Sequence, residues 1–201
     1  MFNPSFMMDK SNTWSRSGGT YGYYVSLKQN VDPALTGTYL FLADSQWASS
    51  MNRIVFRYAD VLLMRAEACA LCGQAAEAIK LVNDVRERAI KMTKTSIVAG
   101  YASQYNVHYA VSKYDTDGPT ADEALKIVKL ERRLELALEY ERFFDLVRWG
   151  EAEATINAFY ANDMSFIEQK TFHKNQNEYL PIPHEQIAAS GGNYKQNIGG
   201  W

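Results

Sequence analysis

Apolar and polar residues alternate most regularly between Thr120 and Gly150. Apolar residues recur there at steps of three or four, the spacing that places side chains on one face of an α-helix. This face consists of Ile127, Leu130, Leu134, Ala137, Tyr140, Phe144 and Val147. Because Leu136, Phe143 and Leu146 add a second apolar side, the pattern predicts one long central helix that is covered on both sides.

The ends of this helix carry start and stop signals. Thr120 and Glu123 match a capping box, in which the threonine hydroxyl accepts the third backbone N–H and the glutamate reaches back to the cap. Neither Gly nor Pro interrupts the segment before Gly150, and glycine commonly ends helices. The helix is therefore predicted to continue without a break as far as Gly150.

The polar positions of this helix are densely charged. They are Glu131, Arg132, Arg133, Glu135, Glu139, Glu141, Arg142, Asp145 and Arg148. A lone buried charge is expensive, so charges on a covered helix are expected to form pairs or to bond neighbouring loops. Glu131, Glu135 and Glu139 share one helix face and are interleaved with Arg132 and Arg142. We interpret them as ion-paired scaffold and not as catalytic acids.

Two further helices are predicted upstream, Ile54–Cys72 and Gln74–Met92, joined at a glycine. Their spacing is close to that of a tetratricopeptide unit, on the residues Leu62, Ala66, Cys69, Gly73, Ala78 and Val82. Such a unit cannot bury its apolar face alone and needs neighbours. A looser second unit would pair Leu125–Trp149 with Glu151–Tyr160. We therefore predict an all-α fold with a tetratricopeptide-like helical scaffold.

Long irregular loops accompany this scaffold. Residues 1–52 are rich in Ser, Gly, Asn and aromatic residues, and two of their stretches favour short strands, Tyr21–Leu27 and Thr38–Leu42. A connection over residues 93–119 carries four tyrosines, Tyr101, Tyr105, Tyr109 and Tyr114. The predicted fold thus combines helices with long irregular loops and leaves room for a few short strands.

Beyond residue 160 the chain becomes polar. Pro181 and Pro183 are expected to hold Leu180–Pro183 extended, and His184–Ala188 is predicted as a single helical turn. We interpret the chain as a single domain of residues 1–201. Its parts are an irregular aromatic-rich segment, a helical scaffold and an extended C-terminal tail, over residues 1–52, 53–160 and 161–201.

Composition argues against several classes of protein. The 201 residues carry a formal net charge of −2 and no basic run, which argues against binding of nucleic acid. No apolar run approaches the length of a membrane span. The first ten residues, MFNPSFMMDK, lack the basic and apolar regions of a signal peptide. Taken by themselves, these features predict a soluble cytoplasmic protein.

The sequence offers no catalytic or metal-binding motif. It contains no GxSxG, no HExxH and no phosphate-cradling glycine loop. Its three histidines are scattered singly, and Cys69 and Cys72, on a predicted helix, are interpreted as plain buried thiols. We therefore expect a protein that is not an enzyme and that uses no metal or cofactor. A glycan hydrolase, which needs two carboxylates across a cleft, is the weakest alternative.

Aromatic residues are the one excess in the composition, with thirteen Tyr and four Trp. Sugars are gripped by aromatic faces beside hydrogen-bonding side chains on loops. Trp14, Tyr21, Tyr23 and Trp47 lie among polar residues in the N-terminal segment and are our candidates for ligand binding. The alternative is that they pack the loops onto the helices. The tyrosines of the 93–119 connection form a second candidate set, and Trp149 is expected in the core.

Four segments, in this order, resemble the C-terminal part of the SusD/RagB family. They are RYADVLLMRAEA (57–68), NDVRERA (83–89), ERRLELALEYERFFDLVRWG (131–150) and YLPIPHEQI with NYKQNIGGW at the end. Members of this family are surface lipoproteins that capture glycans or other nutrients beside a TonB-dependent transporter. The resemblance implies non-catalytic capture of an oligosaccharide or other nutrient at the outer-membrane surface, with a SusC-like transporter as partner.

Family members are longer than this chain. Their N-terminal half supplies further tetratricopeptide helices, an export signal and a lipidated cysteine, so the resemblance predicts that this chain is a fragment. A fragment is expected to expose the apolar face meant for the missing helices. The alternative function is that of a cytoplasmic tetratricopeptide-type adaptor for protein interactions. A single convincing repeat and long aromatic connections argue against the adaptor.

Overall fold

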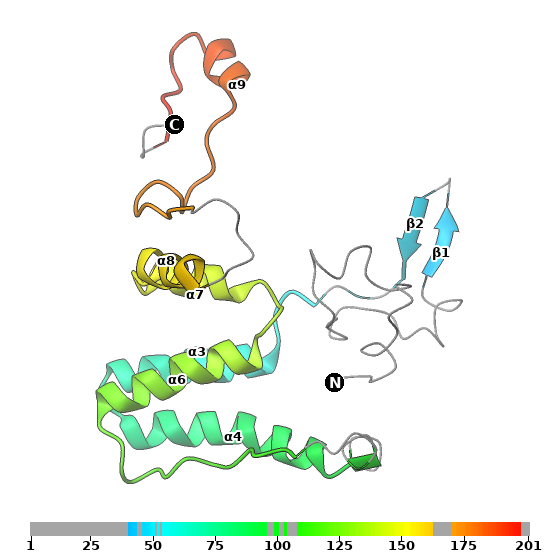
Figure 1. The fold of residues 1–201 in the computed structure, drawn as a ribbon, viewed down its shortest axis with the longest axis vertical. Coiled ribbons are helices and arrows are strands. Elements are labelled where there is room, and N and C mark those ends of the chain that lie inside the picture. The colour runs from blue at the N-terminus through cyan, green and yellow to red at the C-terminus, as the bar shows by residue number, and fades with distance from the viewer. Residues whose placement is uncertain are drawn as a thin grey trace. The chain divides into compact units, whose positions relative to one another are not determined.

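A computed structural model describes residues 40–43, 46–50, 52, 54–95, 99–100, 103, 108–162 and 170–197. This part of the chain contains six helices and one two-stranded hairpin (Figure 1). The chain divides into two compact units, Met1–Leu138 and Glu139–Trp201. The helices confirm the predicted all-α fold, and the hairpin corresponds to the short strands for which the prediction left room.

The hairpin consists of β1 (Leu40–Ala43) and β2 (Gln46–Ser49), which pair antiparallel. β1 overlaps the predicted strand Thr38–Leu42, whereas β2 was not predicted from the sequence. The other predicted strand, Tyr21–Leu27, lies outside the described residues.

The helices α3 (Tyr58–Leu71) and α4 (Ala75–Thr93) pack against each other and meet at a glycine turn. Gly73 has a φ of +77°, which glycine adopts without steric cost. The Gln74 N–H donates to the Cys69 carbonyl at 2.8 Å, which satisfies a carbonyl at the end of α3. The predicted glycine between two helices is confirmed, and α4 begins and ends within one residue of its predicted bounds.

The start of α3 differs from the prediction, because the helix begins at Tyr58 and not at Ile54. Arg57 has an extended backbone, with φ −122° and ψ 150°. Its guanidinium donates to a carboxylate oxygen of Glu135 at 2.9 Å and to the Glu135 carbonyl at 3.1 Å. The residue that the sequence placed inside a helix instead ties the start of α3 to a distant helix end.

The predicted capping box is present at the start of α6 (Ala121–Glu135). The Glu123 N–H donates to the Thr120 hydroxyl at 3.3 Å, and the Thr120 N–H donates to the Glu123 carboxylate at 2.8 Å. Two backbone donors that a helix start leaves without partners are thereby used. The local sequence thus fixes where this helix begins.

The prediction of one unbroken helix as far as Gly150 is wrong. α6 ends at Glu135, and α7 (Glu141–Arg148) follows after a turn. Leu138 and Tyr140 have φ values of +64° and +70°, which a right-handed helix does not contain. The Glu135 carbonyl, in the last residue of α6, accepts from the Arg57 guanidinium. A tertiary contact therefore meets the helix where it stops.

The core of the first unit lies where α3, α4 and α6 pack against one another (Figure 1). Its buried residues are Leu63, Ala66, Ala70, Ala78, Ile79, Leu81, Val82, Val85, Ala124 and Val128. Ala66 and Ala78 are fully buried, as expected where small residues let two helices approach closely. Burying each large aliphatic side chain stabilises the fold by about 1.5 to 3 kcal/mol.

The buried side of α6 is not the apolar face predicted from the sequence. Its buried residues are Ala124, Val128, Glu131 and Arg132. By contrast, the side chains of Leu130 and Leu134 are 45% and 55% exposed, and Tyr140 and Phe144 beyond the helix end are exposed as well. Periodicity placed the apolar face on the wrong side of the helix, whereas the expectation that charges on a covered helix form pairs is met by Glu131 and Arg132, which are buried against partners on other helices.

In the second unit, α7 and α8 (Ala152–Asn162) are joined at Gly150, whose φ is +70°. The Glu151 N–H donates to the Leu146 carbonyl at 2.8 Å, which closes the end of α7. The glycine stop and the short helix predicted after it are both confirmed. The buried hydrophobic cluster of this unit contains Leu146, Ala152 and Phe172.

Side-chain amides hold the chain that follows α8. Asn157 donates to the Phe172 carbonyl at 3.0 Å and accepts the Phe172 N–H at 2.7 Å. Gln196 bonds the carbonyl and N–H of Ile182 at 3.0 and 2.8 Å, just before α9 (His184–Ala189). The helical turn predicted at His184 is confirmed.

Candidate functional site

The four aromatic residues predicted to bind ligand are not brought together by described contacts. Trp14, Tyr21 and Tyr23 lie outside the described residues. The backbone of Trp47 lies in β2 opposite Leu42, and its side chain is outside the description. All four residues stay predictions.

The tyrosines of the connection between α4 and α6 separate into two kinds. Tyr101 and Tyr105 lie outside the described residues. Tyr114 is half-buried and packs against the core, with the Arg86 guanidinium 4.5 Å from the centre of its ring. Tyr109 is 47% exposed. Of the two described tyrosines, Tyr114 therefore anchors the connection, and Tyr109 is available to a ligand.

Three side chains of α4 hold this connection in place. The side-chain amide of Asn83 donates to the Tyr114 carbonyl at 2.9 Å and accepts the Tyr114 N–H at 2.8 Å. It thus satisfies both backbone polar groups of Tyr114, as a paired strand would. Arg86 donates to the Ser112 carbonyl at 2.6 Å, and Glu87 pairs with Lys113 at 2.9 Å. The α4 residues are spaced at i, i+3 and i+4, which places them on one face of the helix.

Acidic residues of α6 are paired with arginines from other elements. Glu131 accepts from Arg86 of α4 at 2.7 Å. Glu135 accepts from Arg57 at 2.9 Å and from Arg88 at 2.5 Å. The interpretation of Glu131 and Glu135 as ion-paired scaffold is confirmed, and these three arginines lie outside α6. No pair of opposed, unpartnered carboxylates is formed by these two residues.

Between α3 and α6 the charges are more deeply buried. Arg132 donates to Asp60 at 2.8 Å, and both residues are buried. Burial raises the pKa of the Glu131 carboxyl above its usual value, against the opposing effect of the Arg86 bond. These contacts join α6 to both of its neighbours through charged groups, in a position where each charge needs its partner.

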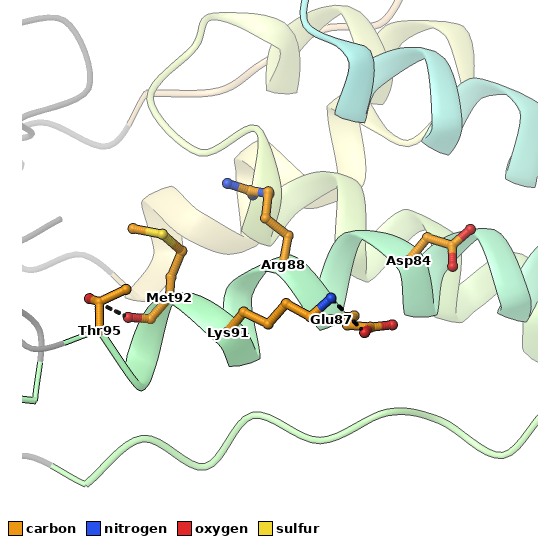
Figure 2. A pocket seen from close by; sticks show the side chains of 6 residues that line it. All are labelled: Asp84, Glu87, Arg88, Lys91, Met92 and Thr95. Atoms are coloured by element: carbon orange, nitrogen blue, oxygen red, sulfur yellow. Dashed lines mark hydrogen bonds and ion pairs between the residues drawn. The ribbon is translucent and has the colours of Figure 1, made fainter.

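A depression of about 410 Å³ lies along α4, beside the anchored connection (Figure 2). It is lined by Asp84, Glu87, Arg88, Lys91, Met92 and Thr95. Glu87 accepts hydrogen bonds from Lys91 and Lys113, which lower its pKa to about 2. Arg88 is bonded to Glu135. The lining charges thus largely serve the scaffold, and the depression presents one methionine and no aromatic face.

The second unit contains several exposed aromatic residues, although no ligand site was predicted there from the sequence. Tyr140, Phe144, Tyr179 and Tyr194 are all exposed. Trp149 was expected in the core but is half-buried, with the guanidinium of Arg148 4.8 Å from its ring centre. The signal for exposure was available in part, since the aromatic residues of the tail follow no helical spacing.

Within the described ranges, no three His, Cys, Asp or Glu residues are grouped as metal ligands. Cys69 is half-buried and Cys72 is exposed, so the interpretation of both as buried thiols is wrong. Cys72 is the residue that caps the C-terminal end of α3, directly before Gly73. Among the helices that the structure describes, none is long and apolar enough to cross a membrane.

Comparison with known proteins gives a consistent result. The model of the SusD family matches residues 3–201. The chain is 32% identical over 151 residues to SusD-like protein P38 of Formosa agariphila, which covers 67% of this chain and 25% of that protein. SusD-like protein P2 of the same organism is 30% identical over 152 residues, covering 75% of this chain and 26% of that protein. SusD-like protein P25, also from Formosa agariphila, is 33% identical over 138 residues, covering 69% and 22%. The chain therefore spans about a quarter of the length of these curated relatives.

Proposed function

The chain belongs to the SusD family, and from this membership we propose that it serves the non-catalytic capture of a glycan or another nutrient at the surface of the outer membrane. The match of the family model to residues 3–201 is the observation that carries the proposal. The captured ligand would be delivered to a TonB-dependent, SusC-like transporter. No bond of the ligand is broken in this process.

The described structure supports a binding role because it combines a packed helical scaffold with a loop that is fixed to it. Three helices form a packed scaffold, and a connection is fixed to it at Ser112, Lys113 and Tyr114. Loops held by a rigid scaffold are where binding residues concentrate. Tyr109 is exposed on this connection. An aromatic face beside polar side chains provides stacking area and orientation for a sugar ring.

The ligand contacts are proposed to come from the aromatic residues predicted in the N-terminal segment, with Tyr109 as an additional contact. Trp14, Tyr21, Tyr23 and Trp47 lie in a stretch that also contains hydrogen-bonding side chains. Stacking accounts for affinity and the polar groups for orientation, and release to the transporter requires only that these weak contacts be exchanged.

The test is calorimetric titration of the complete gene product with a panel of glycans, followed by single alanine variants. Replacing one stacking aromatic residue is expected to weaken binding about two- to tenfold, the equivalent of roughly 0.5 to 1.5 kcal/mol. Tyr194→Ala, an exposed aromatic residue in the other unit, is the matched control and should bind as the wild type does. Wild-type binding in all four N-terminal variants would reject the proposed contacts, and lack of binding to any glycan would reject glycan capture.

Cell fractionation tests the proposed location separately. Recovery of the protein with the outer membrane, together with a SusC-like transporter in mild detergent, is the expected result. Recovery in the cytoplasm would favour the adaptor considered as the alternative function.

A further inference from the structure

The guanidinium of Arg86 connects three parts of the first unit. It donates to the Ser112 carbonyl at 2.6 Å and to Glu131 of α6 at 2.7 Å. It also lies 4.5 Å from the centre of the Tyr114 ring. Its side chain is only 12% exposed. Arg86 therefore links a carboxylate on one helix to the position of the connection that precedes that helix.

Arg86 is the one cation bonded to Glu131 within the part of the chain that the structure describes, and Glu131 is 5% exposed. The other charged groups near the α6 carboxylates are already engaged. Directly before α3, Arg57 pairs with Glu135, and on α3 Asp60 pairs with Arg132; from α4, Arg88 pairs with Glu135; on the connection, Lys113 pairs with Glu87. The like charge of Glu135 on α6 acts on Glu131 as well.

We propose that protonation of Glu131 releases Arg86 and thereby frees residues 108–112 of the connection, while Asn83 keeps Tyr114 in place. A protonated Glu131 no longer balances the guanidinium charge. A covered cation without a counter-charge is costly, so Arg86 moves toward water. The Ser112 carbonyl then loses its donor, and the Tyr114 ring loses the cation above it.

The release is partial because the remaining anchors do not depend on Glu131. The two hydrogen bonds between Asn83 and the backbone of Tyr114 involve no ionisable group. Lys113 stays bonded to Glu87, whose pKa is lowered to about 2, so that this carboxylate keeps its charge in mild acid. The connection is thus expected to open from its 108 end and to stop at Lys113 and Tyr114. Tyr109, the exposed tyrosine, lies in the freed part.

The pKa values of the two carboxyl groups beside the connection are shifted in opposite directions. Burial raises the pKa of Glu131, whereas hydrogen bonds from two lysines lower that of Glu87. As the pH falls, Glu131, which holds Arg86, is therefore protonated before Glu87, which holds Lys113. A raised pKa in the folded state means that the fold binds this proton more tightly than the unfolded chain does. Protonation of Glu131 consequently favours the folded helices, and the opening is local.

The experiment is nuclear magnetic resonance of the isotope-labelled full chain between about pH 7 and about pH 4, a range chosen around ordinary carboxyl values. The Glu131 side-chain carbon reports its titration, and backbone relaxation reports the mobility of residues 109–112. We expect the mobility of these residues and the Tyr114 ring shift to change with the midpoint of Glu131. Unchanged relaxation through that titration, or change only together with the amides of α4 and α6, would overturn the proposal.

A variant tests the same step at neutral pH. Glu131→Gln removes the charge while keeping the shape, and chymotrypsin cleavage after Tyr109, in the freed part, is expected to become about tenfold faster, since cleavage follows the population of the open form. Glu185→Gln, on exposed α9, is the matched control, and His108→Gln removes the histidine of the connection without abolishing the acid response. Wild-type cleavage in Glu131→Gln with full helix content would overturn the proposal. If that variant loses helix, the acid titration of the wild-type chain decides.

Discussion

The two units of the chain differ in how they combine apolar and polar contacts. Among the residues that the structure describes in the first unit, ten buried residues of α3, α4 and α6 form one core, and charged side chains cross between all three helices. Among those described in the second unit, the buried cluster has three members, and amide side chains bond the backbone of the tail. Apolar burial is the main source of stability, so the first unit is expected to be the more stable scaffold.

The units nevertheless share one device. Asn83 bonds both backbone groups of Tyr114, and Asn157 bonds both backbone groups of Phe172. Each asparagine lies on a helix and bonds the backbone of an irregular segment beside it. In the first unit this contact is backed by an arginine and a large core, whereas in the second it is backed by few buried side chains. Similar polar contacts therefore occur in the two units beside buried apolar clusters of very different size.

The strongest way to break the first unit is to remove one partner of its most buried ion pair. Asp60→Ala leaves the Arg132 guanidinium without the carboxylate that it bonds at 2.8 Å. The free energy of unfolding, measured by urea denaturation, is expected to fall by about 3 to 5 kcal/mol, because a buried charge loses its counter-charge. Asp60→Leu combined with Arg132→Met should recover most of this loss, since both charges are then absent.

The matched control is the exposed pair Arg65–Glu77, which has a similar distance of 2.9 Å. Glu77→Ala is expected to cost at most about 1 kcal/mol, as exposed pairs contribute little. Equal losses for Asp60→Ala and Glu77→Ala would show that burial does not set the strength of these pairs.

These charged contacts also mark the limit of what the sequence predicts. Local signals were sufficient for the capping box at Thr120 and for the glycine turns at Gly73 and Gly150, because each depends on a few neighbouring residues. The end of α6 at Glu135 was not predictable in this way. No glycine or proline marks it, and the residue that bonds the Glu135 carbonyl there is Arg57, 78 residues earlier in the chain.

The same limit applies to the buried face of α6 and to the candidate site. Periodicity assigned Leu130 and Leu134 to the core, but the structure buries Glu131 and Arg132, because their partners on other helices satisfy them. Only the partners, which lie far away in sequence, reveal that a charged position is buried. Likewise, Tyr109 and Tyr114 have the same residue type, and only the contacts from α4 distinguish the exposed one from the anchor.

Replacing the two asparagines tests the comparison at intermediate size. Asn83→Ala and Asn157→Ala each remove two hydrogen bonds to backbone, a loss of about 1 to 3 kcal/mol where the freed groups stay covered. Amide hydrogen exchange is expected to rise at Tyr114 in the first variant and at Phe172 in the second. Because its core is smaller, the second unit should also show faster amide exchange at residues other than Phe172, including those of α8. Exchange that spreads farther in the first unit would reverse the proposed order of stability.

The smallest effect on stability is expected on the exposed face of α3. Tyr58, Val61 and Met64 lie at steps of three on this helix and are all exposed. Glutamine keeps a good helix propensity, so Tyr58→Gln, Val61→Gln and Met64→Gln together should change the free energy of unfolding by only about 0.5 kcal/mol per site. Binding of a hydrophobic dye and self-association, measured by sedimentation, should both fall, because a contiguous apolar surface is removed. Lys126→Gln on α6 is the exposed control, and it should leave dye binding unchanged. A large loss of stability in the triple variant would instead show that this face of α3 is covered in solution.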